Sequence, residues 1–94
     1  MRYTVLWDTD VETAFINAWT AADSPMRAIL THIANWVDQN LAEDPDKLGQ
    51  FRDDLNAYIL AVPLSDSAAR VAITYQVLAD DRQVRVVRLL FSGA

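Results

Sequence analysis

The C-terminal quarter of the chain carries arginines where a buried strand would be expected. The segment "ARVAITYQVLADDRQVRVVRLLFSGA" runs from Ala69 to Ala94 and contains two apolar runs separated by Asp80 and Asp81. Arginine occurs at position 70 in the first run, and again at positions 82, 85 and 88. Guanidinium groups bind phosphates and carboxylates through paired, charge-assisted hydrogen bonds. Arginines that share one face of a sheet would therefore form an anion-binding surface.

The face on which Arg88 lies depends on the register of the last hairpin. If the loop between the two runs has an even number of residues, Arg88 is opposite Ile73 on the core face. If the number is odd, as with a loop of residues 80–82 and a bulge, Arg88 is opposite Thr74 on the open face. Burying an unpaired guanidinium costs on the order of 3–5 kcal/mol. This cost favours the open face.

We predict a site that binds an anion or a cellular target on this open face. Its candidate residues are Arg52, Arg70, Thr74 and Arg88. A purely structural alternative stays open. In that alternative Arg88 pairs with a carboxylate and stiffens the sheet, while Arg82 and Arg85 are solvated at the turn.

Other residue types give no sign of catalysis, a metal site or a cofactor. The acidic pairs, such as Asp8/Asp10 and Asp53/Asp54, lack the loop spacing that would bring about six oxygens around a hard cation. The sequence has one histidine, His32, and no cysteine. Its two glycines exclude a glycine-rich phosphate loop. We therefore expect no catalytic residue, no metal and no cofactor.

Composition limits the classes of partner. A chain of 94 residues has room for one domain, 1–94. Residues 1–55 carry four basic and ten acidic side chains, whereas residues 56–94 carry four basic and three acidic ones. A net charge of −5 makes the chain a poor general binder of nucleic acid, so we expect weak or no direct binding. No apolar run approaches the ~20 residues of a membrane span and no basic flank precedes an apolar leader, so we expect a cytoplasmic protein.

Hydrophobic periodicity predicts two helices near the N-terminus. The first has Asp8 or Asp10 as its expected N-cap and presents an apolar stripe of Val11, Ala14, Phe15, Ala18, Trp19 and Ala22. The second has Ser24 as its expected N-cap and Pro25 at its first position. Its stripe consists of Ile29, Leu30, Ile33, Val37 and Leu41, with Trp36 at the margin. Asp44-Pro45 ends it, because a residue before proline is disfavoured in helical geometry.

Four segments have the composition and alternation of strands. These are Arg2–Trp7, Asn56–Leu64, Arg70–Val77 and Gln83–Phe91. Asp46–Asp54 is expected to be a loop and Ser65–Ala68 a turn, while Pro63 restricts its strand to an edge or an end. The order β-α-α-β-β-β predicts an α+β fold in which a two-helix hairpin packs on one face of a four-stranded, mainly antiparallel sheet.

Two motifs add a family resemblance to this order of elements. The first is "L-x-x-D-P-x-x-x-G" at Leu41, Asp44, Pro45 and Gly49, and the second is "R-V-x-x-x-Y-x-V-x-x-D-D-R-x-V-x-V" from Arg70. Together they resemble the RelE/ParE superfamily of bacterial toxins from toxin–antitoxin pairs and plasmid stabilisation. The resemblance covers nearly the whole chain. It implies a twisted sheet with strand order 1-4-3-2, both helices on one side, and an antitoxin segment that wraps and neutralises the toxin.

The resemblance also implies two kinds of activity, of which one needs residues that this chain lacks. RelE-type members cleave mRNA in the ribosomal A site, whereas ParE-type members poison DNA gyrase. The Tyr-Lys-x-Lys pattern of the nucleases corresponds to residues 58–61, where Ile59 and Ala61 occupy the two lysine positions. Ala72 occupies the position of an arginine in the next strand, and the chain ends without the C-terminal arginine or His-Tyr pair. An mRNA endonuclease is therefore not expected.

Two functions from different classes follow. The first is a toxin-like component that acts by binding a cellular target, closer to ParE than to RelE, with an antitoxin protein as partner. The second is a catalytically inactive, degenerate family member that serves as a protein-interaction module, binding a partner or forming a homodimer. The acidity of the chain and the apolar strand end "VVRLLF" favour the second.

Overall fold

The computed structural model describes residues 2–64 and 70–92. Along the chain it contains β1 (Thr4–Trp7), α1 (Thr9–Ala21), α2 (Ser24–Asn40), α3 (Pro45–Leu48), β2 (Gln50–Arg52), β3 (Ala57–Val62), β4 (Arg70–Leu78), a 3-10 turn (Ala79–Asp81) and β5 (Gln83–Ser92). The turn predicted at Ser65–Ala68 lies outside the described residues.

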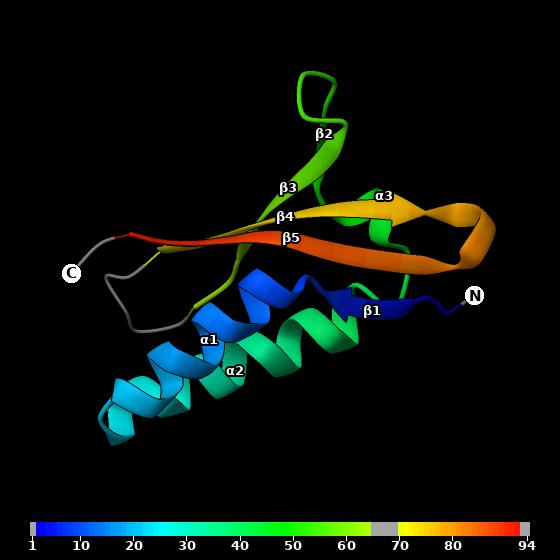
Figure 1. Cartoon of the computed structure of the whole chain (residues 1–94). Helices are drawn as coiled ribbons and strands as arrows, with labels where there is room; N and C mark the ends of the chain where they lie inside the picture. Colours follow the sequence, from blue (N-terminus) through cyan, green and yellow to red (C-terminus); the bar gives the residue numbers. More distant parts are fainter. Residues whose placement is uncertain (1, 65–69, 93–94) are drawn as a thin grey trace.

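One twisted sheet and two long helices form two layers (Figure 1). The strand order is β1-β5-β4-β3-β2, in which β1 runs parallel to β5 and every other neighbour is antiparallel. Helices α1 and α2 form a hairpin on one side of the sheet (Figure 1). The predicted α+β architecture and the implied order of the four predicted strands are confirmed. Strand β5, which is mostly apolar, lies between β1 and β4 as an inner strand of the sheet.

The predicted loop at Asp46–Asp54 is wrong in one respect, because it contains a short helix, α3, and a fifth strand, β2. Strand β2 pairs with β3 through Gln50↔Ile59 and Arg52↔Ala57. A strand of three residues has no detectable periodicity, and it forms because β3 supplies a partner across the intervening turn. The sheet therefore has five strands rather than four.

Helix α2 anchors the hairpin to the sheet. Its predicted stripe is confirmed, since Leu30, Ile33 and Val37 are buried against the strands. The predicted cap is wrong: Asp23, not Ser24, is the N-cap, and its carboxylate accepts a hydrogen bond of 3.0 Å from the N–H of Met26. An aspartate in this position also opposes the positive end of the helix dipole.

Helix α1 is covered much less than α2. None of its residues is buried, although Val11 and Phe15 contact the edge of the core. Ile16 and Trp19 remain largely exposed. The stripe predicted for this helix is therefore only partly used for packing within the chain.

A β-bulge decides the register of the β4–β5 hairpin. From Leu78↔Gln83 to Tyr75↔Val86 the strands pair across an even, four-residue loop. Continued without interruption, this pairing would place Arg88 opposite Ile73. The register instead shifts between Thr74 and Tyr75, so that Arg88 is opposite Thr74 and on the open face. The predicted face of Arg88 is confirmed, but a bulge at Val87, not an odd loop, produces it.

Tyr75, on the core face of β4, links the segment around α3 to the sheet through hydrogen bonds. Its hydroxyl donates a hydrogen bond of 2.7 Å to the carbonyl oxygen of Pro45 and accepts one of 3.0 Å from the N–H of Gly49. Its ring stacks on Tyr58 with a centroid separation of 5.4 Å. Burial raises the pKa of the Tyr75 phenol to about 12, against the lowering effect of the Gly49 hydrogen bond.

Stability is expected to fall as the pH rises from 10 to 12. The unfolded phenol ionises near pH 10 and the folded one near 12, so between these values the native state binds more protons and loses free energy relative to the unfolded state. The slope is at most about 1.4 kcal/mol per pH unit. Urea unfolding of the wild type and of Tyr75→Phe across pH 8–12 would measure it. The difference between the two proteins should shrink above pH 10, and a constant difference would contradict the assignment.

Candidate functional site

The face of the sheet opposite the two long helices carries the predicted site residues. Cross-strand pairs define a row on this face, from Gln50 through Ile59 and Thr74 to Arg88. Thr74 is half-buried and the Arg88 side chain is exposed. These two residues are direct cross-strand neighbours, as predicted.

The other two candidate residues lie on the same face but farther away. Arg70 is four residues from Thr74 along β4, which is about 13 Å along an extended strand. The pair Ala72↔Leu90 separates Arg70 from Arg88. Arg52 lies at the far edge of the sheet in β2, several strand spacings of about 4.8 Å from Arg88. The four residues therefore share a face without converging on one small anion.

Arg85 belongs to this face and was not among the candidate residues. It is opposite Gln76, in the row next to that of Arg88 and Thr74. We call Thr74, Gln76, Arg85 and Arg88 the open-face cluster. The structural alternative placed Arg85 at the turn, and strict alternation along β5 would put Arg85 and Arg88 on opposite faces. A bulge between two arginines three residues apart is the feature that brings both onto one face.

Ion pairs neutralise part of this surface. Arg85 pairs with Asp8, at the junction of β1 and α1, and Arg52 forms two hydrogen bonds with Asp54. Within residues 2–64 and 70–92, no carboxylate lies within ion-pair distance of Arg88. The structural alternative thus assigned the pairing to the wrong arginine: Arg85 holds a carboxylate, whereas Arg88 presents its guanidinium to solvent.

The positions that the family resemblance matches to nuclease residues also lie on this face, and they are apolar. Ile59 and Ala61 of β3 are opposite Thr74 and Ala72 of β4. His32 is on α2, where its Nε2 lies 3.2 Å from the carbonyl oxygen of Pro63. The open face can therefore hold an anionic or hydrogen-bonding group, but these positions supply no proton donor or acceptor.

The acidic pairs have local roles in the described structure. Asp44 precedes α3, Asp53 and Asp54 form the β2–β3 turn, and Asp80 and Asp81 form the 3-10 turn. Throughout the described ranges, no three histidine, aspartate or glutamate side chains gather to hold a metal ion. No helix there is long and apolar enough to span a membrane.

Comparison of the fold with solved structures identifies it. One chain of the RelBE2 toxin–antitoxin complex from Mycobacterium tuberculosis superimposes with a TM-score of 0.71 at 16% identity, covering 100% of this chain and 95% of that one. A mutant of the E. coli toxin RelE in the free state gives a TM-score of 0.59 at 19% identity, covering 95% and 82%.

The same RelE mutant bound to a peptide of its antitoxin RelBc gives 0.54 at 20% identity, covering 100% and 87%. No protein-family model and no curated protein matches the sequence. The structural likeness extends over the whole chain at low sequence identity. The chain therefore has the fold of the RelE toxins, as the resemblance of its sequence to the RelE/ParE superfamily predicts.

Proposed function

We propose that this protein is the toxin component of a bacterial type II toxin–antitoxin pair, that it acts by binding a cellular target, and that an antitoxin neutralises it. The observation that carries the proposal is the whole-chain similarity to toxins of this fold, one of them bound to an antitoxin peptide. Binding rather than cleavage is supported by the open face, where Ile59, Ala61 and Ala72 take the places of the nuclease side chains.

Target recognition is assigned to the open-face cluster together with Arg70. Arg88 offers a solvated guanidinium beside Thr74, and Gln76 and Arg85 extend the hydrogen-bonding surface along the strands. Charged hydrogen bonds of this kind contribute roughly 1.5–3 kcal/mol each. A partner with carboxylate or phosphate groups on an otherwise flat surface fits this arrangement. We propose a ParE-like action with DNA gyrase as the target, supported by the apolar residues Ile59, Ala61 and Ala72 at the positions matched to nuclease side chains.

Tightly induced expression of the chain alone is expected to arrest bacterial growth. In Arg70→Ala/Arg88→Ala the loss of two charged contacts should weaken target binding by at least about a hundredfold and relieve the arrest. The matched control is Arg2→Ala/Arg82→Asn, which removes the same charge away from the open face and keeps a residue tolerant of the positive φ of 51° at position 82. This control should still arrest growth.

Purified protein would then separate the mechanisms. Inhibition of gyrase supercoiling without cleavage of ribosome-bound mRNA is the expected result, while mRNA cleavage would contradict a binding mechanism. Normal growth with abundant soluble protein would contradict the toxin proposal in that host.

A second candidate function is a protein-interaction module that poisons nothing. Two observations favour it: the net charge of −5, and a first helix that buries none of its side chains within the chain. Co-expression with the partner protein separates the candidates. A host that expresses a toxin grows only when the antitoxin is also present, whereas a host that expresses an interaction module grows without the partner.

A further inference from the structure

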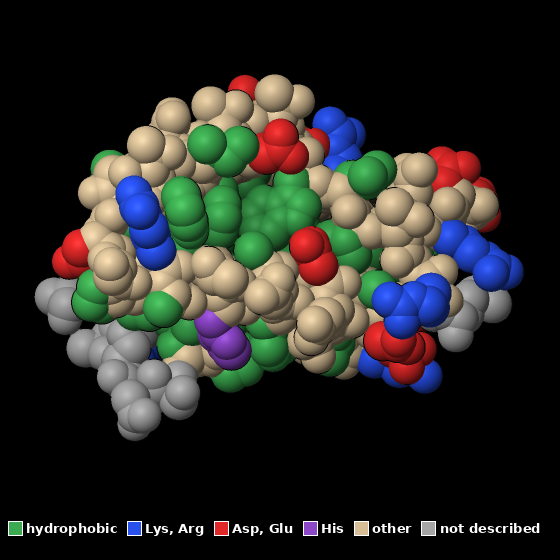
Figure 2. Space-filling model, turned by 90° about the horizontal axis from the view of Figure 1, so that it is seen from below, with side chains coloured by type: hydrophobic (Ala, Val, Ile, Leu, Met, Phe, Trp, Pro, Cys, Tyr) green, Lys and Arg blue, Asp and Glu red, His purple; other side chains and the backbone are tan. Residues whose placement is uncertain are grey.

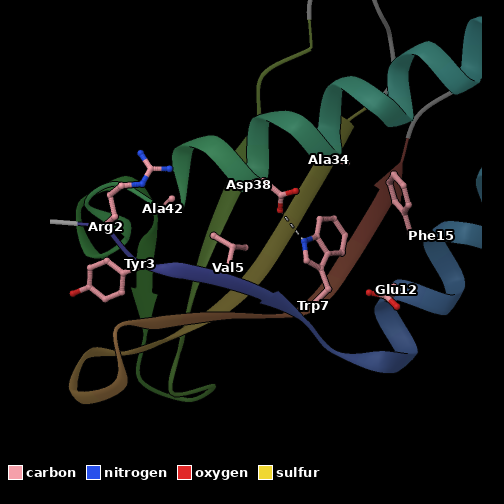
Figure 3. Close-up of a pocket in the computed structure, with 9 residues that line it drawn as sticks. All are labelled: Arg2, Tyr3, Val5, Trp7, Glu12, Phe15, Ala34, Asp38 and Ala42. Carbon is pink, nitrogen blue, oxygen red and sulfur yellow. Dashed lines mark hydrogen bonds between the residues drawn. The ribbon is translucent and has the colours of Figure 1, made fainter.

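The side of the molecule opposite the open face contains an apolar groove. It lies between β1, α1 and α2 and has a volume of about 420 Å³. Figure 2 shows it as a hydrophobic hollow with acidic side chains at its edge. Its floor is formed by Val5 and Trp7 of β1, Phe15 of α1 and Ala34 of α2 (Figure 3). We call this the β1–helix groove.

The groove exists because neither helix fills it. Trp7 and Phe15 meet edge to face, with ring centroids 5.5 Å apart, and both remain half-buried. On the α2 side the lining residues include Ala34 and Ala42, whose methyl groups leave the space open. A half-covered pair of aromatic rings in a concave apolar surface is typical of a pocket for a bulky apolar side chain.

Two carboxylates give the rim of the groove a negative charge. Glu12 projects from α1 and Asp38 from α2 (Figure 3). Asp38 accepts a hydrogen bond of 3.2 Å from the indole N–H of Trp7. In the described part of the chain no lysine or arginine forms an ion pair with either carboxylate, whereas Arg2 at the end of the groove is paired with Glu43. Both carboxylates are thus available to a cationic partner.

We propose that the β1–helix groove binds a basic amphipathic segment of the antitoxin, with a bulky apolar side chain on Trp7 and Phe15 and lysine or arginine side chains on Glu12 and Asp38. The identity of the partner as an antitoxin rests on the proposed function, but the chemistry of the segment does not. A second copy of this chain fits less well, because residues 1–55 carry ten acidic and only four basic side chains. The groove and the open-face cluster lie on opposite faces of the sheet, so the groove anchors the antitoxin, and neutralisation requires another part of the antitoxin to cover the open face.

Two synthetic amphipathic 15-residue peptides of the same leucine pattern test the charge requirement, one with lysine and one with glutamate at every polar position. Titration into the full-length protein is followed by the NMR signals of the tryptophan indole N–H groups, with Trp7 assigned through Trp7→Phe. The lysine peptide is expected to shift the Trp7 signal and the glutamate peptide to leave it unchanged. Equal binding of both peptides, or binding without a shift at Trp7, would overturn the proposal.

Isosteric variants test the two carboxylates. Glu12→Gln/Asp38→Asn keeps an acceptor for the Trp7 indole and should weaken the lysine peptide about tenfold through loss of two exposed ion pairs. Asp80→Asn/Asp81→Asn removes the same charge at the hairpin turn, outside the lining of the groove, and should change the affinity by less than about twofold. Equal weakening by both variants would mean non-specific attraction and would refute a built site.

Analytical ultracentrifugation of the protein alone completes the test. A dimer that blocks peptide binding would mean that a second copy of the chain, and not an antitoxin segment, occupies the groove, and would overturn the proposal. The outcome is independent of the toxin assay. Peptide binding without growth arrest would support the groove as a binding site and reject the toxin function. Growth arrest without peptide binding would support the toxin function and reject the groove as a binding site.

Discussion

Replacing Gly49 with alanine is expected to lower the free energy of unfolding by about 2–4 kcal/mol. A Cβ atom at this position would lie 2.7 Å from the hydroxyl oxygen of Tyr75 and 2.9 Å from the carbonyl oxygen of Ile59. Both distances are well inside van der Waals contact, so the backbone must move. That movement also lengthens the hydrogen bond from the Gly49 N–H to Tyr75.

Space, and not backbone conformation, imposes glycine at position 49. Its φ of −97° and ψ of 176° are open to any residue. The chain comes close to β3 here because the next residue, Gln50, pairs with Ile59, and the Tyr75 hydroxyl, which bridges Pro45 and Gly49, holds it there. The glycine of the sequence motif is therefore explained by its contact with the tyrosine of the second motif.

Urea unfolding of Gly49→Ala, Tyr75→Phe and the double variant would check this. Tyr75→Phe removes the clashing oxygen, so the double variant should lose less stability than the sum of the two single variants. Lys47→Ala, an exposed change in the same segment, should alter stability by less than about 0.5 kcal/mol. Additive losses would mean that Gly49 and Tyr75 are not coupled.

Replacing Ile33 with alanine is expected to cost about 2–5 kcal/mol. Ile33 is 0% exposed and belongs to the core cluster between α2 and the sheet. Truncating it removes apolar contacts and leaves a cavity that closely packed neighbours cannot fill. Native domains have only about 5–15 kcal/mol of stability, so this change removes a large share of it.

The same substitution on α1 should have a small effect. Ile16 is 54% exposed, and Ile16→Ala is expected to cost under about 1 kcal/mol. Urea midpoints of the two variants compare the helices directly, with Ile33→Val, expected at about 0.5–1.5 kcal/mol, as a graded variant that stays folded. Equal losses at Ile16 and Ile33 would contradict the unequal burial of the two helices.

Local patterns were sufficient for most of the secondary structure. The alternation of β4 places Val71, Ile73 and Tyr75 on the core face, as the period of two predicts. The stripe of α2 and the end of β3 before Pro63 follow from side-chain spacing and from the missing N–H of proline. These features depend on neighbours within a few residues.

The site residues were predicted only in part. The cost of burying a guanidinium correctly predicted that Arg88 lies opposite Thr74 on the open face. The bulge at Val87 that makes this pairing possible has no signature in the sequence. Arg85 was missed for the same reason. Arg70 and Arg52 were assigned to one small patch, whereas strand spacing separates them.

By itself, the amino-acid sequence determined the order of the elements, the faces of β4 and the core stripe of α2. Only the tertiary structure decided that residues 50–52 form a strand, that Val87 is bulged, that α1 stays half-covered and that Trp7, Phe15, Glu12 and Asp38 surround one groove. The physical reason is the range of the interactions. Backbone propensity and side-chain period act over a few residues, but strand pairing, burial and cavity shape depend on groups that are distant in sequence and meet only in the folded chain.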